Sequence, residues 1–372
     1  MHAARVESIG NGVVGAVYST RMGIHAIGQA YATAVGILPK SGIGQLTRML
    51  GNDGLNLDTL QKCHINFVVG KRRELVLAMD WTEFDNDGQS CLAVYAVSDH
   101  GRATPLAWRT YYKSRMKGHQ KQYEYDMVER LHAILDPDVR ITLLADRGFG
   151  DQRLYELLLL LGWDFVIRFR GNIQVTSARG TTKTAKQWVP SNGRVKMLDN
   201  ARVTADQFSV PAVVVVRDKR MKEPWILATS LAGQKASRIV KYYGRRFTIE
   251  ETFRDHKDLR YGMGLKATHI GEPARRDRLL TLGAVAHTLL TLLGAASERT
   301  GMDMQLKANT TKRRTHSLYR QGKDWHGAIR TMRFERRKRL LSAFDEVLGD
   351  HETVCGAFGP LCTTGMLMPD AA

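Results

Sequence analysis

Residues 141–146 read ITLLAD, a short apolar run that ends on an aspartate. Residues 75–80, LVLAMD, repeat the same arrangement. Short apolar runs of this kind are typical of strands buried inside a sheet. Each run therefore predicts a strand that delivers an aspartate, Asp80 or Asp146, to the edge of that sheet. Taken singly, either aspartate could instead cap a turn or a helix, because Asp is common at such positions.

The residues around these two runs alternate between strand and helix patterns. The further elements that we predict are strands over 91–97 and 104–111, a helix over 122–135, a helix over 154–161 and a strand over 164–169. Three strands, a helix, a strand, a helix and a strand predict an α/β fold with a mixed sheet flanked by helices. The run VVVV at 213–216 lies in a Thr-, Lys- and Gly-rich stretch and predicts a β-rich insertion.

These patterns divide the chain into five regions. We expect a helical N-terminal region, the first part of an α/β core, the β-rich insertion, a helical second part of the core and a basic C-terminal region, over residues 1–70, 71–170, 171–230, 231–300 and 301–372. A length of 372 residues fits a large core with an added unit, since single cores stop growing near ~250–300 residues.

The charge of the chain is strongly positive. It carries 55 Lys and Arg against 37 Asp and Glu, a formal net charge of +18. Such an excess favours a polyanionic partner. Residues 305–339 alone hold 12 Lys and Arg against two acidic residues, which is weaker evidence for contact with a nucleic-acid backbone.

Cysteine usage and hydropathy indicate an intracellular protein. Cys63 and Cys91 lie far from Cys355 and Cys362, and no Cys-x-x-Cys occurs, so we expect neither a disulfide framework nor a structural zinc site. The N-terminus lacks the apolar core of a secretory signal, and we expect a cytoplasmic protein. Residues 279–297 form an uncharged run long enough to span a bilayer, but its Thr, Ser, His and Gly residues favour a buried core helix and no membrane partner.

A third acidic residue, Glu250, lies in a segment predicted to be helical, residues 243–257. At ~100° per residue, five polar side chains of this segment fall within about 80° of one another. They are Tyr243, Arg246, Glu250, Arg254 and Lys257. Glu251 points away from the centre of this stripe. A stripe of this composition is not a core face; it is either a solvated surface with ion pairs such as Glu250–Arg254 or a site that binds anions.

The spacing Tyr-x2-Arg-x3-Glu-x6-Lys, met here by Tyr243, Arg246, Glu250 and Lys257, resembles the signature of DDE-class transposases of bacterial insertion sequences, the insertion sequence 4 family. Residues 79–82, MDWT, resemble the family's first-aspartate strand, and residues 144–149, LADRGF, its second-aspartate motif. The motifs occur in the family's order, over about residues 40–295. Phe247 departs from the pattern, because the family usually has Trp there, and we expect Phe247 to pack.

The resemblance implies an RNase H-like core in which Asp80, Asp146 and Glu250 bind two Mg²⁺ ions, with Mn²⁺ as a substitute. Oxygen ligands suit these hard cations. Two such ions can activate the attacking oxygen and stabilise the leaving oxygen of a phosphodiester. The implied activity is metal-dependent cleavage at the ends of an insertion sequence, followed by strand transfer into target DNA in cut-and-paste transposition.

The resemblance also implies the partners. They are double-stranded DNA, as the terminal inverted repeats of the element and as target DNA, and a second copy of the chain in a homodimer. We expect residues 1–70 to bind the terminal repeats, in a bacterial cytoplasm and in association with the nucleoid.

Side chains near the acidic residues are expected to contact this DNA. The expected contacts are Tyr243, Arg246, Lys257, Arg254, Arg147 and Trp225. Arg suits bidentate phosphate contacts and Lys acts as a point charge. The family often places a Trp at a position like that of Trp225, where it stacks on a flipped base; a core or sheet position is the alternative. Flipping costs a few kcal/mol and stacking returns about 1–3 kcal/mol per base.

Two other functions stay open at this stage. An RNase H-like nuclease that only hydrolyses DNA would have the same acidic residues and metals. A catalytically idle, DNA-binding descendant of a transposase could act as a repressor. The three intact acidic residues argue against the idle descendant.

Overall fold

The computed structural model describes residues 3–350 except residues 71, 99, 220 and 261. The chain forms two compact units. The first unit comprises Met1–Arg72, Trp81–Gln120 and Thr248–Ala372, and the second comprises Arg73–Asp80 and Lys121–Phe247. Cys355, Cys362 and the last part of the predicted basic region lie outside the described residues.

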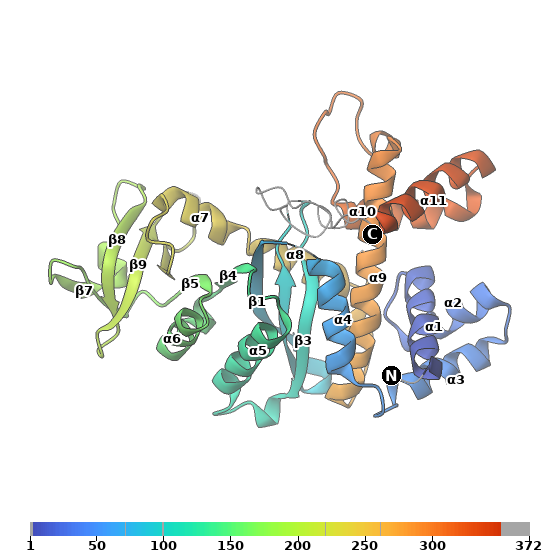
Figure 1. The fold of residues 1–372 in the computed structure, drawn as a ribbon, viewed down its shortest axis with the longest axis horizontal. Coiled ribbons are helices and arrows are strands. Elements are labelled where there is room, and N and C mark those ends of the chain that lie inside the picture. Colours follow the sequence, from blue (N-terminus) through green and yellow to red (C-terminus); the bar gives the residue numbers. More distant parts are fainter. Residues whose placement is uncertain (1–2, 71, 99, 220, 261, 351–372) are drawn as a thin grey trace. The chain divides into compact units, whose positions relative to one another are not determined.

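The fold is α/β with a ten-stranded mixed sheet, as the order of apolar runs predicts. Its strand order is β3-β2-β1-β4-β5-β10-β9-β8-β6-β7 (Figure 1). The strands are β1 Glu74–Phe84, β2 Gln89–Ala96, β3 Thr104–Tyr112, β4 Arg140–Ala145, β5 Asp164–Arg168, β6 Gln174–Thr176, β7 Thr182–Thr184, β8 Lys196–Val203, β9 Phe208–Val216 and β10 Trp225–Thr229. Each strand that we predicted in the core is confirmed to within two residues at its start. The predicted end of the first strand is wrong, because β1 continues to Phe84 and Asp80 lies within it.

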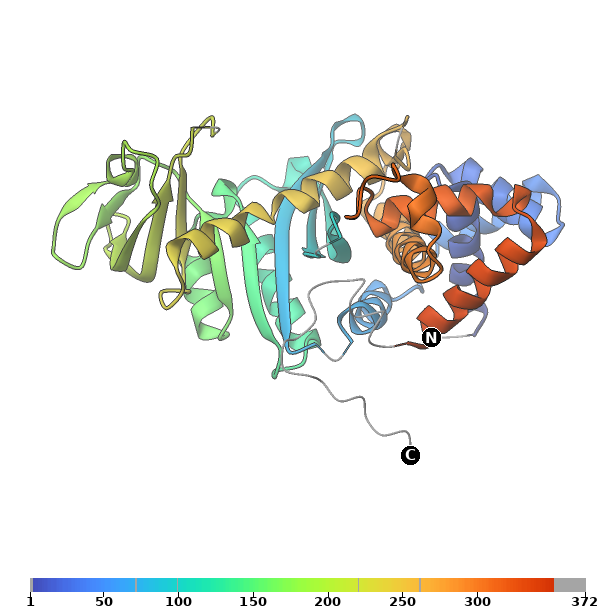
Figure 2. The same ribbon diagram turned by 90° about the horizontal axis from the view of Figure 1, so that it is seen from above.

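The second unit contains the parallel part of the sheet. Strand β4 pairs in parallel with the first residues of β1 and with β5. Figures 1 and 2 show helices α5 (Gln120–Ile134) and α6 (Gln152–Leu160) on one face of these strands and α7 (Ala236–Gly244) on the other. The strands are therefore covered on both faces, which explains why their sequences are continuously apolar rather than alternating.

Residues 171–230 contain the strands β6 to β10. Strands β6, β7, β8 and β9 pair antiparallel with one another, and β9 pairs with β10, which returns the chain to β5. The β-branched run at 213–216 is the end of β9 and is fully buried.

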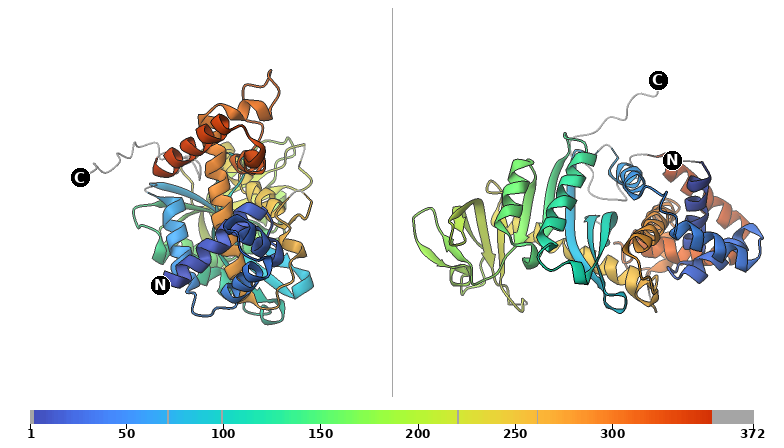
Figure 3. Two further views of the ribbon diagram at one scale, coloured as in Figure 1. Left: turned by 90° about the vertical axis from the view of Figure 1, so that its right-hand side faces the viewer. Right: turned by 90° about the horizontal axis from the view of Figure 1, so that it is seen from below.

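Helices dominate the first unit. They are α1 Ala3–Ser19, α2 Ile24–Val35, α3 Pro39–Leu50, α4 Leu57–Val69, α8 Phe247–Lys257 (whose first residue still belongs to the second unit), α9 Pro273–Arg299, α10 Leu318–Ala328 and α11 Phe334–Gly349. Helix α9 packs against α1, α10, α11 and strand β3 (Figure 3). It is long and apolar enough to cross a membrane, yet 83% of its most apolar window is buried inside the protein. The prediction of a buried core helix is confirmed.

The prediction of one helix over residues 243–257 is wrong. Helix α7 ends at Gly244 and α8 begins at Phe247. The N–H groups of Arg245 and Arg246 each donate to a carbonyl three residues back, at 3.0 Å, which tightens the chain into a turn. Tyr243 and Arg246 therefore do not share a helical stripe with Glu250. The residues of the stripe that α8 does carry are Glu250, Arg254 and Lys257.

Candidate active site

Asp80 and Asp146 follow aligned residues of two neighbouring parallel strands. In the register of β1 and β4, Met79 pairs with Ala145. Each aspartate is the next residue along its strand direction, so both lie where the pairing of β1 and β4 ends; β4 ends there too, while β1 continues to Phe84. Neighbouring strands lie ~4.8 Å apart. The second unit thus places two carboxylates side by side at the carboxyl end of the parallel pairing of β1 and β4, and open α/β sheets bind ligands at the carboxyl ends of their strands.

Asp146 also shapes the turn that follows it. One of its carboxylate oxygens accepts the backbone N–H of Gly148 at 2.8 Å and caps the short helix η3 (Arg147–Phe149). The capping role and the proposed ligand role are compatible, because an ionised carboxylate has about four lone-pair sites. Arg147 points to Glu223, 3.1 Å away, and Glu223 also pairs with Arg168 at 2.8 Å. Arg147 is accordingly engaged in a surface ion-pair group.

Asp80 forms an ion pair with Arg246. The guanidinium lies 3.1 Å from the carboxylate of Asp80, and the Arg246 side chain is 6% exposed. The turn between α7 and α8 directs this arginine inward. The guanidinium also lies 5.0 Å from the ring centre of Phe247, so cation–π attraction supports the ion pair. The structure brings together two signature residues that lie 166 positions apart in the sequence.

An aromatic cluster in the second unit surrounds this ion pair. The ring of Trp225 lies 4.9 Å from Tyr243 and 5.7 Å from Phe247, centre to centre. Tyr243 is 1% exposed, and burial raises the pKa of its phenol. Phe247 packs in this cluster, as we expected, while keeping 40% of its surface exposed. Trp225 begins strand β10 and is half-buried, so it is packed by one part of its ring and open to solvent by another.

Helix α8 presents Glu250 in the first unit. Glu250 lies in the first turn of the helix, where the helix dipole favours a negative charge, and its side chain is exposed. The opposite face is anchored: the hydroxyl of Thr252 accepts the N–H of Ala103 at 2.9 Å, and the ring of Phe253 lies 5.2 Å from Tyr95. Arg254 forms its ion pair with Glu251 rather than with Glu250. This anchoring fixes the face of α8 on which Glu250 lies.

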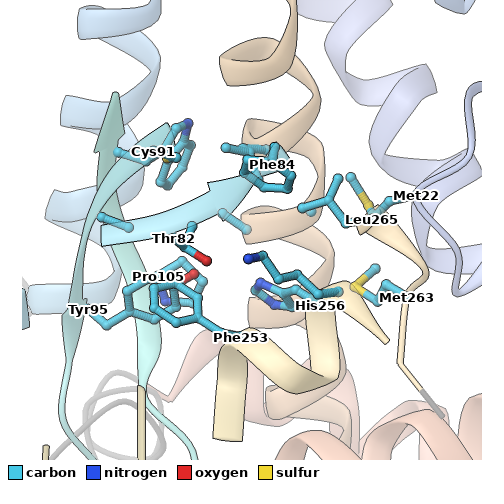
Figure 4. A pocket seen from close by; sticks show the side chains of 16 residues that line it. Met22, Thr82, Phe84, Cys91, Tyr95, Pro105, Phe253, His256, Met263 and Leu265 are labelled. Carbon is cyan, nitrogen blue, oxygen red and sulfur yellow. The ribbon is translucent and has the colours of Figure 1, made fainter. Parts of the chain in front are cut away.

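Lys257 is held at the end of strand β1. Its ammonium donates to the backbone carbonyl of Glu83 at 2.8 Å and lies 5.0 Å from the ring centre of Phe84. Burial lowers the pKa of Lys257. The same side chain borders an apolar cavity of about 30 Å³ in the first unit, whose lining includes Phe84, Tyr95 and His256 (Figure 4).

The environment of Cys91, which lines this cavity, does not favour a reactive thiol. Burial raises the pKa of Cys91 to about 12, so its thiol stays protonated near neutral pH. His256 lines the same cavity, and burial lowers its pKa to about 4, so its imidazole is neutral. A reactive cysteine needs a lowered pKa and some exposure. Cys91 and His256 are therefore structural, and the carboxylates remain the candidates for chemistry.

The donor atoms at the end of the β1–β4 pairing fit a hard divalent cation. Asp80 and Asp146 supply carboxylate oxygens, the ligands that Mg²⁺ prefers, and Mg²⁺ commonly takes one or two carboxylates together with waters and phosphate oxygens. Among the described residues, no three His, Cys, Asp or Glu side chains are grouped closely enough to hold a metal ion. The two aspartates belong to the second unit and Glu250 to the first, so the third ligand stays a prediction.

Two residues of the site were not anticipated. Glu223 links Arg147 and Arg168, and the carbonyl of Glu83 receives Lys257. Neither residue stands in a motif, and each contact joins residues far apart in the chain. The sequence does show that Glu223 is an acidic residue close to Trp225. Only the fold shows that Glu223 contacts Arg147 and Arg168.

The comparison with known families agrees with this geometry. Residues 71–289, more than half of the chain, match the family model of the transposase DDE domain. The chain belongs to this family. It is a DDE transposase with an RNase H-like core, a fold whose family binds DNA and generally uses divalent metals. No curated protein matches the chain.

Proposed function

We propose that this transposase cuts DNA at the ends of its own element and joins the freed 3′-OH to target DNA, in the manner of the insertion sequence 4 family. The observation that carries the proposal is the register of β1 and β4, which aligns Asp80 and Asp146 where the pairing of these two strands ends. With Glu250 they form the proposed catalytic triad. Two bound Mg²⁺ ions would activate the attacking oxygen and stabilise the leaving oxygen.

The cations of the signature would hold the DNA strand. Arg246 already lies 3.1 Å from Asp80, so its guanidinium is in place for a phosphate oxygen at that carboxylate. Lys257 would contribute a second positive charge; its partial burial strengthens its attraction to a phosphate because screening by water is reduced. Tyr243 supports Arg246 from its buried position. Arg147 and Arg254 would reach DNA by exchanging their present carboxylate partners for phosphate.

Trp225 is the proposed stacking residue for a base displaced at the DNA end. Its ring is packed against Tyr243 and Phe247, which orders it before DNA arrives. An ordered ring loses less entropy on stacking. The N-terminal region 1–70 is proposed to recognise the terminal repeats, and a homodimer is proposed to hold two ends together.

Cleavage of a labelled duplex that carries the element end tests the proposal. The purified full chain should cut this duplex in the presence of Mg²⁺ and, when target DNA is added, produce a strand-transfer product. Asp146→Asn and Glu250→Gln should each lower cleavage by at least ~100-fold, since each removes charge that the metals need. Matched controls are Asp206→Asn, an exposed turn residue of the same unit, and Glu251→Gln, the neighbour of Glu250 on α8.

Each rival function has its own outcome in this assay. Cleavage without any strand-transfer product would identify a hydrolytic nuclease. Binding of the end duplex without metal-dependent cleavage would identify a DNA-binding repressor. Full activity of Glu250→Gln together with loss of activity in Glu251→Gln would show that the third carboxylate is Glu251 and not Glu250.

A further inference from the structure

The β-rich insertion carries a large share of the positive charge of the chain. We define the insertion sheet as residues 171–222, which contain strands β6 to β9. These residues hold ten Lys and Arg against three Asp, a net charge of +7 out of the total of +18. The described cations are all exposed: Arg179, Lys183, Lys186, Arg194, Lys196, Arg202, Arg217, Lys219 and Lys222. A concentration of one sign of charge on one small sheet needs an explanation.

The nine described cations of the insertion sheet are not paired with carboxylates. In the part of the chain that the structure describes, none of these nine side chains lies in an ion pair. Arginines elsewhere in the same unit do form ion pairs, among them Arg73, Arg140, Arg147, Arg168 and Arg246. The fold thus pairs arginines beside the parallel strands and leaves the charge of the insertion available to an external anion.

Trp188 organises two of these cations. The ammonium of Lys196 lies 4.6 Å from the centre of the indole ring and that of Lys183 lies 5.4 Å from it. Two like charges near one ring repel each other, and cation–π attraction of about 0.5–1 kcal/mol each at an exposed site offsets part of that repulsion. A phosphate between or beside the two ammonium groups would remove the remaining repulsion.

The ring of Trp188 is itself firmly held. Its indole N–H donates to the carbonyl of Val175 at 3.0 Å. Trp188 ends the short helix η4 (Ala185–Trp188), which Thr184 and Gln187 close with a reciprocal capping box. The two ammonium groups therefore lie beside a ring that is held in place, and a contact ordered in advance lowers the entropy that binding costs.

We propose that the insertion sheet binds the phosphate backbone of duplex DNA, with Lys183, Trp188 and Lys196 as its fixed contact point. The proposal rests on the proposed function for the choice of DNA as the polyanion. The contacts are to phosphate, so binding here is independent of base sequence. Its role is to position DNA next to the site rather than to recognise the element end.

The test measures binding of the full chain to a fluorescent duplex of arbitrary sequence by anisotropy, without divalent metal, from 50 to 200 mM salt. The double variant Lys183→Gln/Lys196→Gln should lower the slope of log affinity against log salt by about 2, since each lost phosphate contact removes about one counterion. The charge-matched control Lys117→Gln/Lys235→Gln alters two exposed lysines outside the insertion and should leave the slope unchanged.

Variants of Trp188 test whether its ring organises the two lysines or whether only their charge matters. Trp188→Phe keeps a ring for the two lysines and should retain most of the affinity, whereas Trp188→Ala should weaken binding at least as much as loss of one lysine. Thermal melting confirms that each variant folds. Equal slopes for the lysine double variant and its control, or preference for anionic vesicles over duplex, would overturn the proposal. Because metal-free binding is measured, loss of this site and failure of cleavage are read out separately.

Discussion

Arg246, a residue of the candidate site, forms a largely buried ion pair. Its guanidinium is 6% exposed and lies 3.1 Å from Asp80, whose side chain is 20% exposed. Removing one partner of a buried ion pair leaves the other charge poorly solvated, and such changes typically cost several kcal/mol. Arg147 forms a comparable pair with Glu223, but both of its side chains are more than half exposed, and pairs of that kind contribute little.

We therefore predict different costs for the two arginines. Arg246→Met should lower the free energy of unfolding by about 3 kcal/mol, because it removes the buried partner of Asp80. Arg147→Met should lower it by less than ~1 kcal/mol. Urea denaturation of the full chain, followed by circular dichroism, measures both. Equal losses in the two variants would show that the Arg246–Asp80 pair contributes no more than a surface contact.

At the scale of elements, helices α9 and α10 cross with almost no space between their backbones. A Cβ added at Gly294 would lie 1.9 Å from the carbonyl oxygen of Leu318, and one added at Gly322 would lie 1.7 Å from that of Leu290. Glycine is thus required on both helices at this crossing. Gly327, also on α10, has nothing within 4 Å of such a Cβ.

Gly322 and Gly327, both on α10, allow a matched test of this close crossing. Gly322→Ala should destabilise the chain by at least ~1–3 kcal/mol, because the two backbones must move apart. Gly327→Ala should be neutral or stabilising by up to ~1 kcal/mol, since Ala favours helix over Gly. Thermal unfolding compares them, and a Gly322→Ala variant as stable as Gly327→Ala would contradict the close crossing.

A buried histidine pair joins α8 to α9. A ring nitrogen of His256 lies 3.1 Å from one of His287, and burial lowers the pKa of both, that of His256 to about 4. In the unfolded chain a histidine has a pKa near ~6.5. Between these values the unfolded state binds more protons, so stability is complete above pH ~6.5 and is lost as the pH falls towards 4.

We predict a loss of about 3 kcal/mol from His256 over this window. His256→Gln should flatten the pH dependence of the free energy of unfolding between pH ~6.5 and 4. His25→Gln, which changes an exposed histidine on α2, should leave it as in the wild type. Unfolding curves collected at several pH values test this prediction. If the free energy of unfolding of His256→Gln depends on pH as steeply as that of the wild type, other groups cause the acid sensitivity.

At the scale of the whole molecule, DNA binding and catalysis should depend on different charges. In the proposed function, binding depends on the net charge of +18, whereas cleavage depends on a few carboxylates and their metals. A chelator should therefore abolish cleavage and leave the affinity for duplex DNA unchanged. Raising the salt from 50 to 200 mM should weaken that affinity by about 10³-fold if six or more phosphates are contacted. Loss of binding on chelation would show that the metals are needed for folding or for DNA binding and not for the reaction alone.

Local sequence patterns determined much of this protein. The runs at 75–79 and 141–145 predict the strands that carry Asp80 and Asp146, because apolar side chains must be buried and the short runs fit strands. Net charge indicates a polyanionic partner, and the uncharged run at 279–297 correctly predicts a core helix. Each of these inferences depends on neighbours in the chain, which the sequence displays directly.

Only the tertiary structure revealed the features that depend on contacts between residues distant in the chain. Helical periodicity continued through residues 243–257, yet the chain turns at Arg245 and Arg246, where the arginine enters an ion pair with Asp80. A pattern of period 3.6 contains no information about a partner 166 residues away. The same holds for Trp188 and its two lysines, whose meeting depends on strand pairing. Burial and charge pairing across the fold, rather than local propensity, settled these positions.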